Sequence, residues 1–478
     1  MKRNNTGKSV GWVSKAAAVL LAAVLAVSVL PSAVFAEESV QSEAEAAIVP
    51  ADPEVVKTNK IEGWPQAPDI NSDYGCLMDY STGTVLYSKG MNVKMPPASL
   101  TKIMTTLLAI ENGDLDAVVT MTETGVAYAT DGSSNLYTQV GEQFTLRDML
   151  YGVMLKSAND MATQVGEFIG GGSLDTFIDM MNERAREIGC YNTNFVNACG
   201  MPADDHVTSA YDLCLICREA LKNETFREII RTKEYTIPAT NMTEERAIAT
   251  HHPFFSDPSY AYEGTLGGKT GYTDAALRTL ATFVRQDDRT LICVTLHAED
   301  MALACEDATA LFDYGFANFT NEQVKKKADV LSGGFVTIPV GTDKNTLTKT
   351  TKDGTDSEVG KTLITTYSYS GHPVGNAVQS VAYLEEKKAA EEEAKRLAEA
   401  ASAGESVSGA EEPVTTEVTP AVSHEGSFFT ATVENVTLPL GITMSRTAFI
   451  AIAALALLIL LGILLIIITV IARGGRDD

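Results

Sequence analysis

A serine and a lysine three residues apart open an apolar segment with helical spacing. Residues 96–102 read PPASLTK and run directly into IMTTLLAI. Because side chains three residues apart share one face of a helix, Ser99 and Lys102 should lie about one turn from each other. The start of a helix favours developing negative charge, and a lysine with a depressed pKa can accept a hydroxyl proton. The pair predicts nucleophilic catalysis, with a plain helix-capping serine as the alternative.

Two further short motifs carry groups that can act on a peptide. Residues 157–159 read SAN, and their hydroxyl and amide could relay a proton and hold a substrate amide, or simply cap a turn. Residues 267–271 read GGKTG and precede a strand-like segment. Glycine beside a strand lets a substrate backbone approach closely, and the lysine adds a second cation. An ordinary glycine-rich turn is the alternative interpretation of this second motif.

The three motifs in this order resemble the S-x-x-K, S-x-N and K-T-G set of penicillin-binding proteins and serine β-lactamases. Their flanks are similar, more narrowly, to the low-molecular-weight penicillin-binding proteins that act as serine-type D-Ala-D-Ala carboxypeptidases. The resemblance extends over roughly residues 70–320. The segments that carry it are residues 96–105, 157–160, 181–182, 206–212, 268–273 and 312–316.

The resemblance implies a role for each motif residue. The implied catalytic residues are Ser99 as nucleophile, Lys102 as its general base and Ser157 as the proton shuttle to the leaving D-alanine. The implied substrate-binding residues are Asn159, Lys269, Thr270, Gly271 and Tyr272. The backbone N–H groups of Ser99 and Tyr272 would form the oxyanion hole. The implied ligands are peptidoglycan stem peptides ending in D-Ala-D-Ala and β-lactam antibiotics, with no cofactor and no metal.

The spacing of apolar residues predicts a mixed α/β (α+β) catalytic domain over residues 68–320. Strand patterns at 75–87, 279–284 and 291–296 enclose helical patterns near 99–111, 146–169, 173–188 and 209–222, and a helix at 302–316 closes the domain. The resemblance implies that this is the β-lactamase/transpeptidase-like fold, an antiparallel sheet with helices. Residues 321–384 are rich in β-branched residues and predict a small all-β domain.

The two ends of the chain predict export and anchoring. Residues 1–36 combine basic, apolar and small-residue regions in the order of a signal peptide, and residues 37–67 indicate a flexible lead-in. Residues 385–445 indicate a charged helix and a disordered stalk, residues 446–472 a transmembrane helix, and residues 473–478 a short cytoplasmic tail. We therefore expect a single-pass protein of the cell membrane whose catalytic domain is extracellular.

Charge and cysteine content exclude some classes of function. The formal net charge of −25 argues against nucleic acid and anionic membrane surfaces as partners. The seven cysteines are odd in number and irregularly spaced. Cys214 and Cys217 form a C-x-x-C within a segment of helical apolar spacing, which favours buried thiols over a metal or redox pair.

The sequence departs from the family pattern at one point. Many relatives carry an arginine before the segment at 312–316 that binds the terminal carboxylate, and residues 301–306 contain none. Either Arg278 or Arg285 replaces this cation, or recognition of the carboxylate is weaker.

Several alternatives remain at this stage. A β-lactamase shares the three motifs but needs a residue that activates the deacylating water, for which no matching context is found. A non-catalytic wall-binding or β-lactam-sensing protein could have kept the fold. A triad formed with His206 and Asp212, and a metal site at His251 and His252, are both disfavoured because no matching motif surrounds them.

Overall fold

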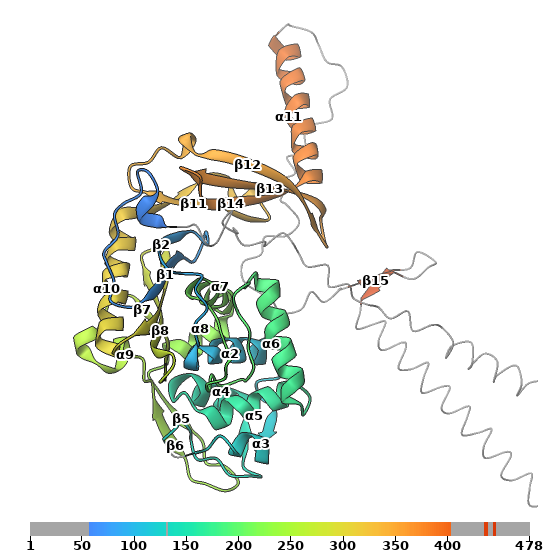
Figure 1. Cartoon of the computed structure of the whole chain (residues 1–478). Helices are drawn as coiled ribbons and strands as arrows, with labels where there is room; N and C mark the ends of the chain where they lie inside the picture. Colours follow the sequence, from blue (N-terminus) through green and yellow to red (C-terminus); the bar gives the residue numbers. More distant parts are fainter. Residues whose placement is uncertain (1–56, 131, 403–434, 438–442, 446–478) are drawn as a thin grey trace, which may run out of the picture. The chain divides into compact units, whose positions relative to one another are not determined.

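The structure, a computed structural model, describes residues 57–130, 132–402, 435–437 and 443–445 (Figure 1). A five-stranded antiparallel sheet in the order β2-β1-β9-β8-β7 lies at the centre of the first domain. Its strands are β1 (Tyr74–Asp79), β2 (Val85–Lys89), β7 (Thr265–Thr273), β8 (Leu277–Gln286) and β9 (Arg289–Ala298). The predicted hairpin at 75–87 and the two later strands are therefore present as β1–β2, β8 and β9.

Helices cover both faces of this sheet because its strands are apolar on both sides. Leu77 and Cys293 point toward helix α10, whereas Cys76 and Val294 point toward the other helices. The helices of this domain are α2 (Thr101–Asn112), α3 (Glu123–Val126), α4 (Leu146–Leu155), α5 (Asn159–Ile169), α6 (Leu174–Ile188), α7 (Ala210–Ala220), α8 (Glu224–Arg231), α9 (Pro253–Ser256) and α10 (Met301–Asn318). Successive strand residues point to opposite faces, so one short strand contributes to two separate cores.

The helical pattern at 146–169 is not one helix. Helix α4 ends at Leu155 and α5 begins at Asn159, because Ser157 has a φ of 60°. A left-handed residue cannot continue a right-handed helix and is uncommon outside glycine. The turn between the two helices carries the S-x-N motif.

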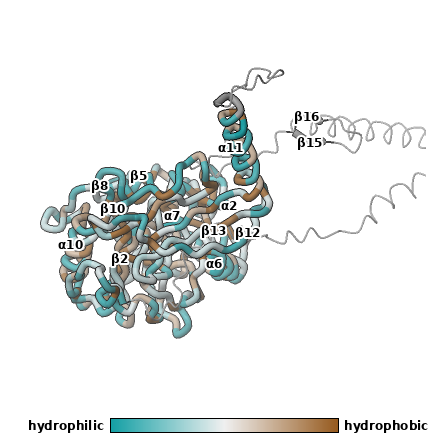
Figure 2. The backbone as a smooth tube through the Cα atoms, turned by 90° about the horizontal axis from the view of Figure 1, so that it is seen from above, coloured by the Kyte–Doolittle hydropathy of each residue, from teal (hydrophilic) through white to brown (hydrophobic). Residues whose placement is uncertain are grey.

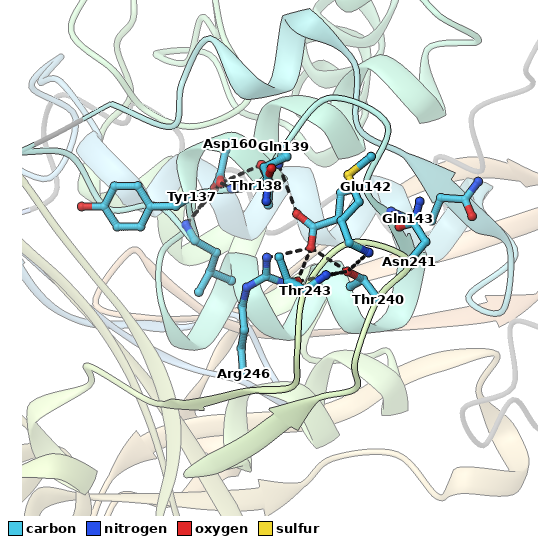
Figure 3. A network of polar contacts seen from close by, with 12 residues as sticks. Tyr137, Thr138, Gln139, Glu142, Gln143, Asp160, Thr240, Asn241, Thr243 and Arg246 are labelled. Atoms are coloured by element: carbon cyan, nitrogen blue, oxygen red, sulfur yellow. Dashed lines mark hydrogen bonds and ion pairs between the residues drawn. The ribbon is translucent and has the colours of Figure 1, made fainter.

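Two small hairpins extend the helical part of the domain. One pairs β3 (Val118–Thr120) with β4 (Gln143–Thr145), and the other pairs β5 (Glu234–Ile237) with β6 (Arg246–Ala249). The long segment between β3 and β4 and the loop between β5 and β6 contact each other through side chains (Figure 3).

A second antiparallel sheet, in the order β10-β11-β14-β13-β12, follows the first domain. Its strands are β10 (Phe319–Gln323), β11 (Ser332–Pro339), β12 (Thr348–Asp356), β13 (Gly360–Tyr369) and β14 (His372–Ser380). The two sheets contact through polar groups that are buried and paired: Thr82 Oγ1 lies 2.6 Å from Thr337 Oγ1, and His372 Nε2 donates to the carbonyl of Val85 at 2.8 Å.

The end of the expected lead-in is ordered rather than flexible. Residues 58–60 form a short 3-10 helix, and Trp64 is 3% exposed. The Trp64 ring packs against Phe319 and His372 at centroid distances of 4.8 and 4.9 Å, and its Nε1 donates to the carbonyl of Leu86. A buried tryptophan with a paired N–H contributes too much apolar contact to leave this segment free.

The charged helix α11 (Val381–Ser402) follows β14 and is largely hydrophilic, whereas hydrophobic segments concentrate inside the domains (Figure 2). A separate pair of short strands, β15 (Asn435–Thr437) and β16 (Thr443–Ser445), is antiparallel. Among the described residues no helix is long and apolar enough to cross a bilayer. The predicted signal peptide at 1–36 and the predicted span at 446–472 lie outside the described residues.

All seven cysteines are reduced and buried, and the prediction of buried thiols at Cys214 and Cys217 is confirmed. Cys214 and Cys217 lie on α7 in the core, where burial raises the pKa of each thiol above its usual range. Thiols with raised pKa values are poor metal ligands and nucleophiles, so this C-x-x-C packs as apolar side chains do.

Candidate active site

Ser99 lies in a tight 3-10 turn, Ala98–Leu100, that leads into α2. Ala98 has a φ of 48°, a conformation that a non-glycine residue adopts only where its surroundings impose it. Two glycines allow neighbouring backbone to approach this turn. A Cβ at Gly200 would lie 1.9 Å from the Ala98 carbonyl oxygen, and a Cβ at Gly271 would lie 2.9 Å from the Ser99 nitrogen. Strand β7 therefore runs directly beside the backbone N–H of Ser99.

Lys102, one turn after Ser99, is completely buried. Its Nζ lies 3.1 Å from Ser99 Oγ, 2.7 Å from Asn159 Oδ1 and 2.6 Å from the carbonyl oxygen of Cys199. Burial lowers the pKa of Lys102 to about 8. A neutral amine has two N–H donors and one lone pair. The two carbonyl oxygens can accept those donors, which leaves the lone pair to accept the Ser99 proton.

Ser157 and Lys269 form a second buried pair beside the first. Lys269 Nζ donates to Ser157 Oγ at 3.0 Å and to the Thr270 carbonyl at 2.8 Å. Burial lowers the pKa of Lys269 well below its usual value, and the charge of Lys102 lowers it further. Because Ser157 Oγ accepts from Lys269, its own proton remains available for donation.

The structure brings the three predicted catalytic residues together with two of the predicted substrate-binding residues. Ser99 lies in the turn before α2 and Lys102 in the first turn of α2, Ser157 lies in the turn before α5, Asn159 is the first residue of α5, and Lys269 lies on β7. The remaining predicted residues follow on β7. Thr270 is half-buried, Gly271 faces Ser99, and the side chain of Tyr272 is 49% exposed. The Tyr272 hydroxyl donates to Asp274 at 3.0 Å, so this residue contributes to the site through its backbone.

A chain of hydrogen bonds that the sequence did not reveal supports the serine turn. The Val196 N–H donates to His206 Nδ1 at 3.0 Å, which places the histidine proton on Nε2. Nε2 donates to Thr101 Oγ1 at 2.8 Å, and Thr101 donates to the Ala98 carbonyl at 2.8 Å. Burial, with a smaller effect of the Lys102 charge, lowers the pKa of His206 to about 4, so the chain stays intact at neutral pH.

His206 and Asp212 do not form a triad with Ser99. Asp212 accepts from the Asn192 N–H and from Thr193 Oγ1, and both nitrogens of His206 are used in the chain above. No group of three or more potential metal ligands occurs in the part of the chain that the structure describes. The two adjacent histidines diverge: His252 is buried against Thr282, and His251 is exposed beside Lys156.

The two arginines considered as carboxylate ligands lie at opposite ends of β8. Arg278 pairs in register with Tyr272 of β7, and its guanidinium lies 4.1 Å from the centre of the Tyr272 ring. Arg285 pairs with Thr290, and its Nε donates to the Asp287 carbonyl in the β8–β9 turn. Only Arg278 lies at the motif end of β7, whereas the Arg285 N–H donates to Gly264 before the start of that strand, so Arg285 is removed as a candidate.

Comparison with known proteins identifies a family over the same region. The profile of the D-alanyl-D-alanine carboxypeptidase family matches residues 62–300. The D-alanyl-D-alanine carboxypeptidase of Streptomyces sp. strain K15 is 33% identical over 260 residues, which cover 52% of this chain and 89% of that protein. The D-alanyl-D-alanine carboxypeptidase DacF of Bacillus subtilis is 31% identical over 253 residues, 52% of this chain and 64% of the relative.

Solved structures give the same result for the fold. The crystal structure of the Streptomyces K15 DD-transpeptidase superposes with a TM-score of 0.50 at 31% identity. It covers 53% of this chain and 100% of the other. The α+β transpeptidase-like fold predicted for the first domain is confirmed, and the second sheet lies outside the residues that the family profile matches.

The pKa of Lys102 leads to a pH prediction. Only the neutral amine can accept the Ser99 proton, so reaction of Ser99 with a fluorescent penicillin should accelerate as pH rises and level off above about 8. Below that value the rate should fall by about tenfold per pH unit. Stopped-time labelling between pH 6 and 10 measures this rate. A rate that is flat across pH 7–9 would contradict a base with this pKa.

Proposed function

The chain belongs to the D-alanyl-D-alanine carboxypeptidase family and is a serine hydrolase of that family. From this premise we propose that it removes the terminal D-alanine from peptidoglycan stem peptides through an acyl-enzyme on Ser99, and that β-lactams acylate the same serine. The observation that carries the proposal is the contact between Ser99 Oγ and a buried lysine whose other partners are two carbonyl oxygens.

The first step is attack of Ser99 on the carbonyl of the penultimate D-alanine. Lys102 takes the hydroxyl proton as the Oγ–C bond forms. The negative charge that develops on the substrate oxygen lies between the backbone N–H groups of Ser99 and Tyr272, at the edge of β7. The close approach that Gly271 permits is what allows these two groups to face one oxygen.

The second step breaks the C–N bond. Ser157 lies on the side of Lys269, and its proton is free to pass to the leaving nitrogen because its oxygen is held by the lysine. D-alanine departs as an amine. Water then attacks the ester, which releases the shortened peptide and restores the Ser99 hydroxyl. Lys269 and Thr270 hold the terminal carboxylate in this scheme, and Asn159 holds the acyl-side amide.

Two alternatives are separated by their products. A β-lactamase would hydrolyse penicillin with turnover, and a sensor would be labelled by penicillin without cleaving peptide. The five polar groups of the site are all present and hydrogen-bonded in two adjacent sets, which favours an enzyme over a sensor. The comparisons name carboxypeptidases and a transpeptidase, which favours action on D-alanyl peptides.

A Ser99→Ala substitution tests the nucleophile. We expect release of D-alanine from a peptide ending in L-Lys-D-Ala-D-Ala to fall by at least about 10³-fold, because the covalent route is lost. Free D-alanine is measured after incubation with wild-type and variant protein. Ser259→Ala, an exposed serine outside the site, should retain full activity. Release by Ser99→Ala at the wild-type rate would reject the assignment.

Arg278 is proposed as the cation that compensates for the missing family arginine. Arg278→Ala should raise KM for the same peptide by roughly tenfold, which is the loss of about 1.4 kcal/mol of carboxylate binding. The same substitution should change kcat much less. Arg285→Ala, at the far end of β8, serves as the matched control and should leave both constants unchanged. Equal effects of the two substitutions would show that Arg278 has no specific role.

We also propose that the protein is exported and anchored in the cell membrane with its catalytic domain outside. The support is the order of basic, apolar and small residues in 1–36 and the continuous apolar run in 446–472. Protease added to intact cells should shorten the protein, whereas a cytoplasmic marker should survive. Protection of the full-length chain in intact cells, with digestion only after lysis, would place it inside.

A further inference from the structure

The residue that follows the S-x-N motif is a fully buried carboxylate with no part in the mechanism above. Asp160 is the second residue of α5 and is 0% exposed. Burying a carboxylate is costly unless hydrogen bonds compensate for the lost water. The donors that surround Asp160 therefore show which parts of the chain it holds together.

Most of these donors lie in the connection between β3 and β4. Asp160 Oδ2 accepts from the Leu136 N–H at 3.2 Å, from the Thr138 N–H at 3.2 Å and from Thr138 Oγ1 at 2.9 Å (Figure 3). Oδ1 accepts from the Met161 N–H of its own helix at 2.9 Å. Between the two bonded residues, Tyr137 has a φ of 51°, which a non-glycine residue adopts only where its surroundings impose it. One carboxylate thus holds both sides of this turn.

The same segment is also bonded to the S-x-N turn through its backbone. The Asn159 N–H donates to the Ser134 carbonyl at 2.8 Å. Residues 134–138 are therefore joined to the start of α5 at two successive positions, one through backbone and one through a side chain. The side chain of Asn159 leads on to the catalytic lysine, because its Oδ1 lies 2.7 Å from Lys102 Nζ.

We propose that Asp160 is a positioning residue for the reaction: its carboxylate ties residues 134–138 to the start of α5 and thereby fixes the places of Ser157 and Asn159 beside Lys102. The inference rests on the proposed function, since it concerns the same reaction. Asp160 acts through its neighbour in the chain. Stabilising the N-terminus of α5 is the simpler role for a carboxylate in a first turn. That role would require only the Met161 N–H, whereas the other donors belong to a separate segment.

The carboxylate also brings a negative charge close to the catalytic lysine. Burial lowers the pKa of Lys102, whereas Cys199 and Asp160 raise it in part. Two further titratable groups face this amine. They are Lys269, whose own pKa is lowered by burial and by the Lys102 charge, and His206, which burial keeps neutral near pH 7. Loss of the Asp160 charge should therefore lower the pKa of Lys102 below about 8.

Asp160→Asn tests the role in the full-length protein. The substitution keeps the shape of the side chain and removes its charge and one acceptor oxygen. We expect the pH midpoint of Ser99 labelling by fluorescent penicillin, measured between pH 6 and 10, to fall by at least about 0.5 pH unit. A looser contact between Asn159 and the amine acts in the same direction as the lost charge. We also expect kcat/KM for release of D-alanine from a peptide ending in L-Lys-D-Ala-D-Ala to fall by about tenfold.

Asp307→Asn is the matched control. Asp307 lies on α10, is 2% exposed and accepts hydrogen bonds from the backbone and side chains of Asn71 and Ser72. Its substitution removes the same charge and oxygen from a buried carboxylate outside the site, so the pH midpoint and kcat/KM should stay unchanged. A milder variant, Thr138→Val, removes one donor to Asp160 and should lower kcat/KM by about threefold.

Each outcome decides between the positioning role and the function on which it rests. A wild-type pH midpoint in Asp160→Asn, or an equal loss of kcat/KM in Asp307→Asn, overturns the role of Asp160 and leaves the proposed function standing. If Asp160→Asn does not fold, wild-type kcat/KM in Thr138→Val overturns that role. No release of D-alanine by the wild type, with Ser99 still labelled by penicillin, overturns the proposed function. The pH midpoints of labelling then still decide whether Asp160 positions the groups around Lys102.

Discussion

The burial of Lys102, which shifts its amine toward the neutral form, is the constraint on which the rest of the site depends. Lowering its pKa from 10.5 to about 8 corresponds to about 3 kcal/mol of preference against the charged form. Removal of the amine from water is what disfavours its charged form, while two carbonyl oxygens and Ser99 Oγ surround the nitrogen. This requires α2, α5 and the segment at Cys199 to converge on one nitrogen.

A second buried lysine, Lys269, acts in the same direction as burial. Lys269 and Lys102 carry the same sign of charge, so a charge on one disfavours a charge on the other, which is the opposite of what the partners in an ion pair do. One takes the nucleophile's proton and the other holds the oxygen of Ser157. Two residues with left-handed backbones, Ala98 and Ser157, lie beside this pair, and the glycines at 200 and 271 make room for the turn at Ala98. Such backbone is retained where the surrounding structure imposes it.

A second buried charge joins distant loops. The fully buried Glu142 accepts from Thr240, Thr243 and Arg246, which are about a hundred residues away in sequence. The second sheet is attached through Trp64, His372 and the Thr82–Thr337 contact, all on the far end of β1 and β2 from the motif residues. It therefore supports the first domain without contributing a side chain to the site described above.

The sequence alone predicted the nucleophile, its lysine and the two other motifs, because their spacing is local and their flanks resemble one family. It also predicted β1, β2, β8, β9 and the main helices, since apolar periodicity is a local property, but it did not predict β7, the strand that carries the K-T-G motif. It did not predict the left-handed backbone of Ser157, because the φ of one residue depends on what packs around it. It did not predict the support of Ser99 by His206, the order of Trp64, or the choice of Arg278 over Arg285. These depend on contacts between distant segments, which only the tertiary structure brings together.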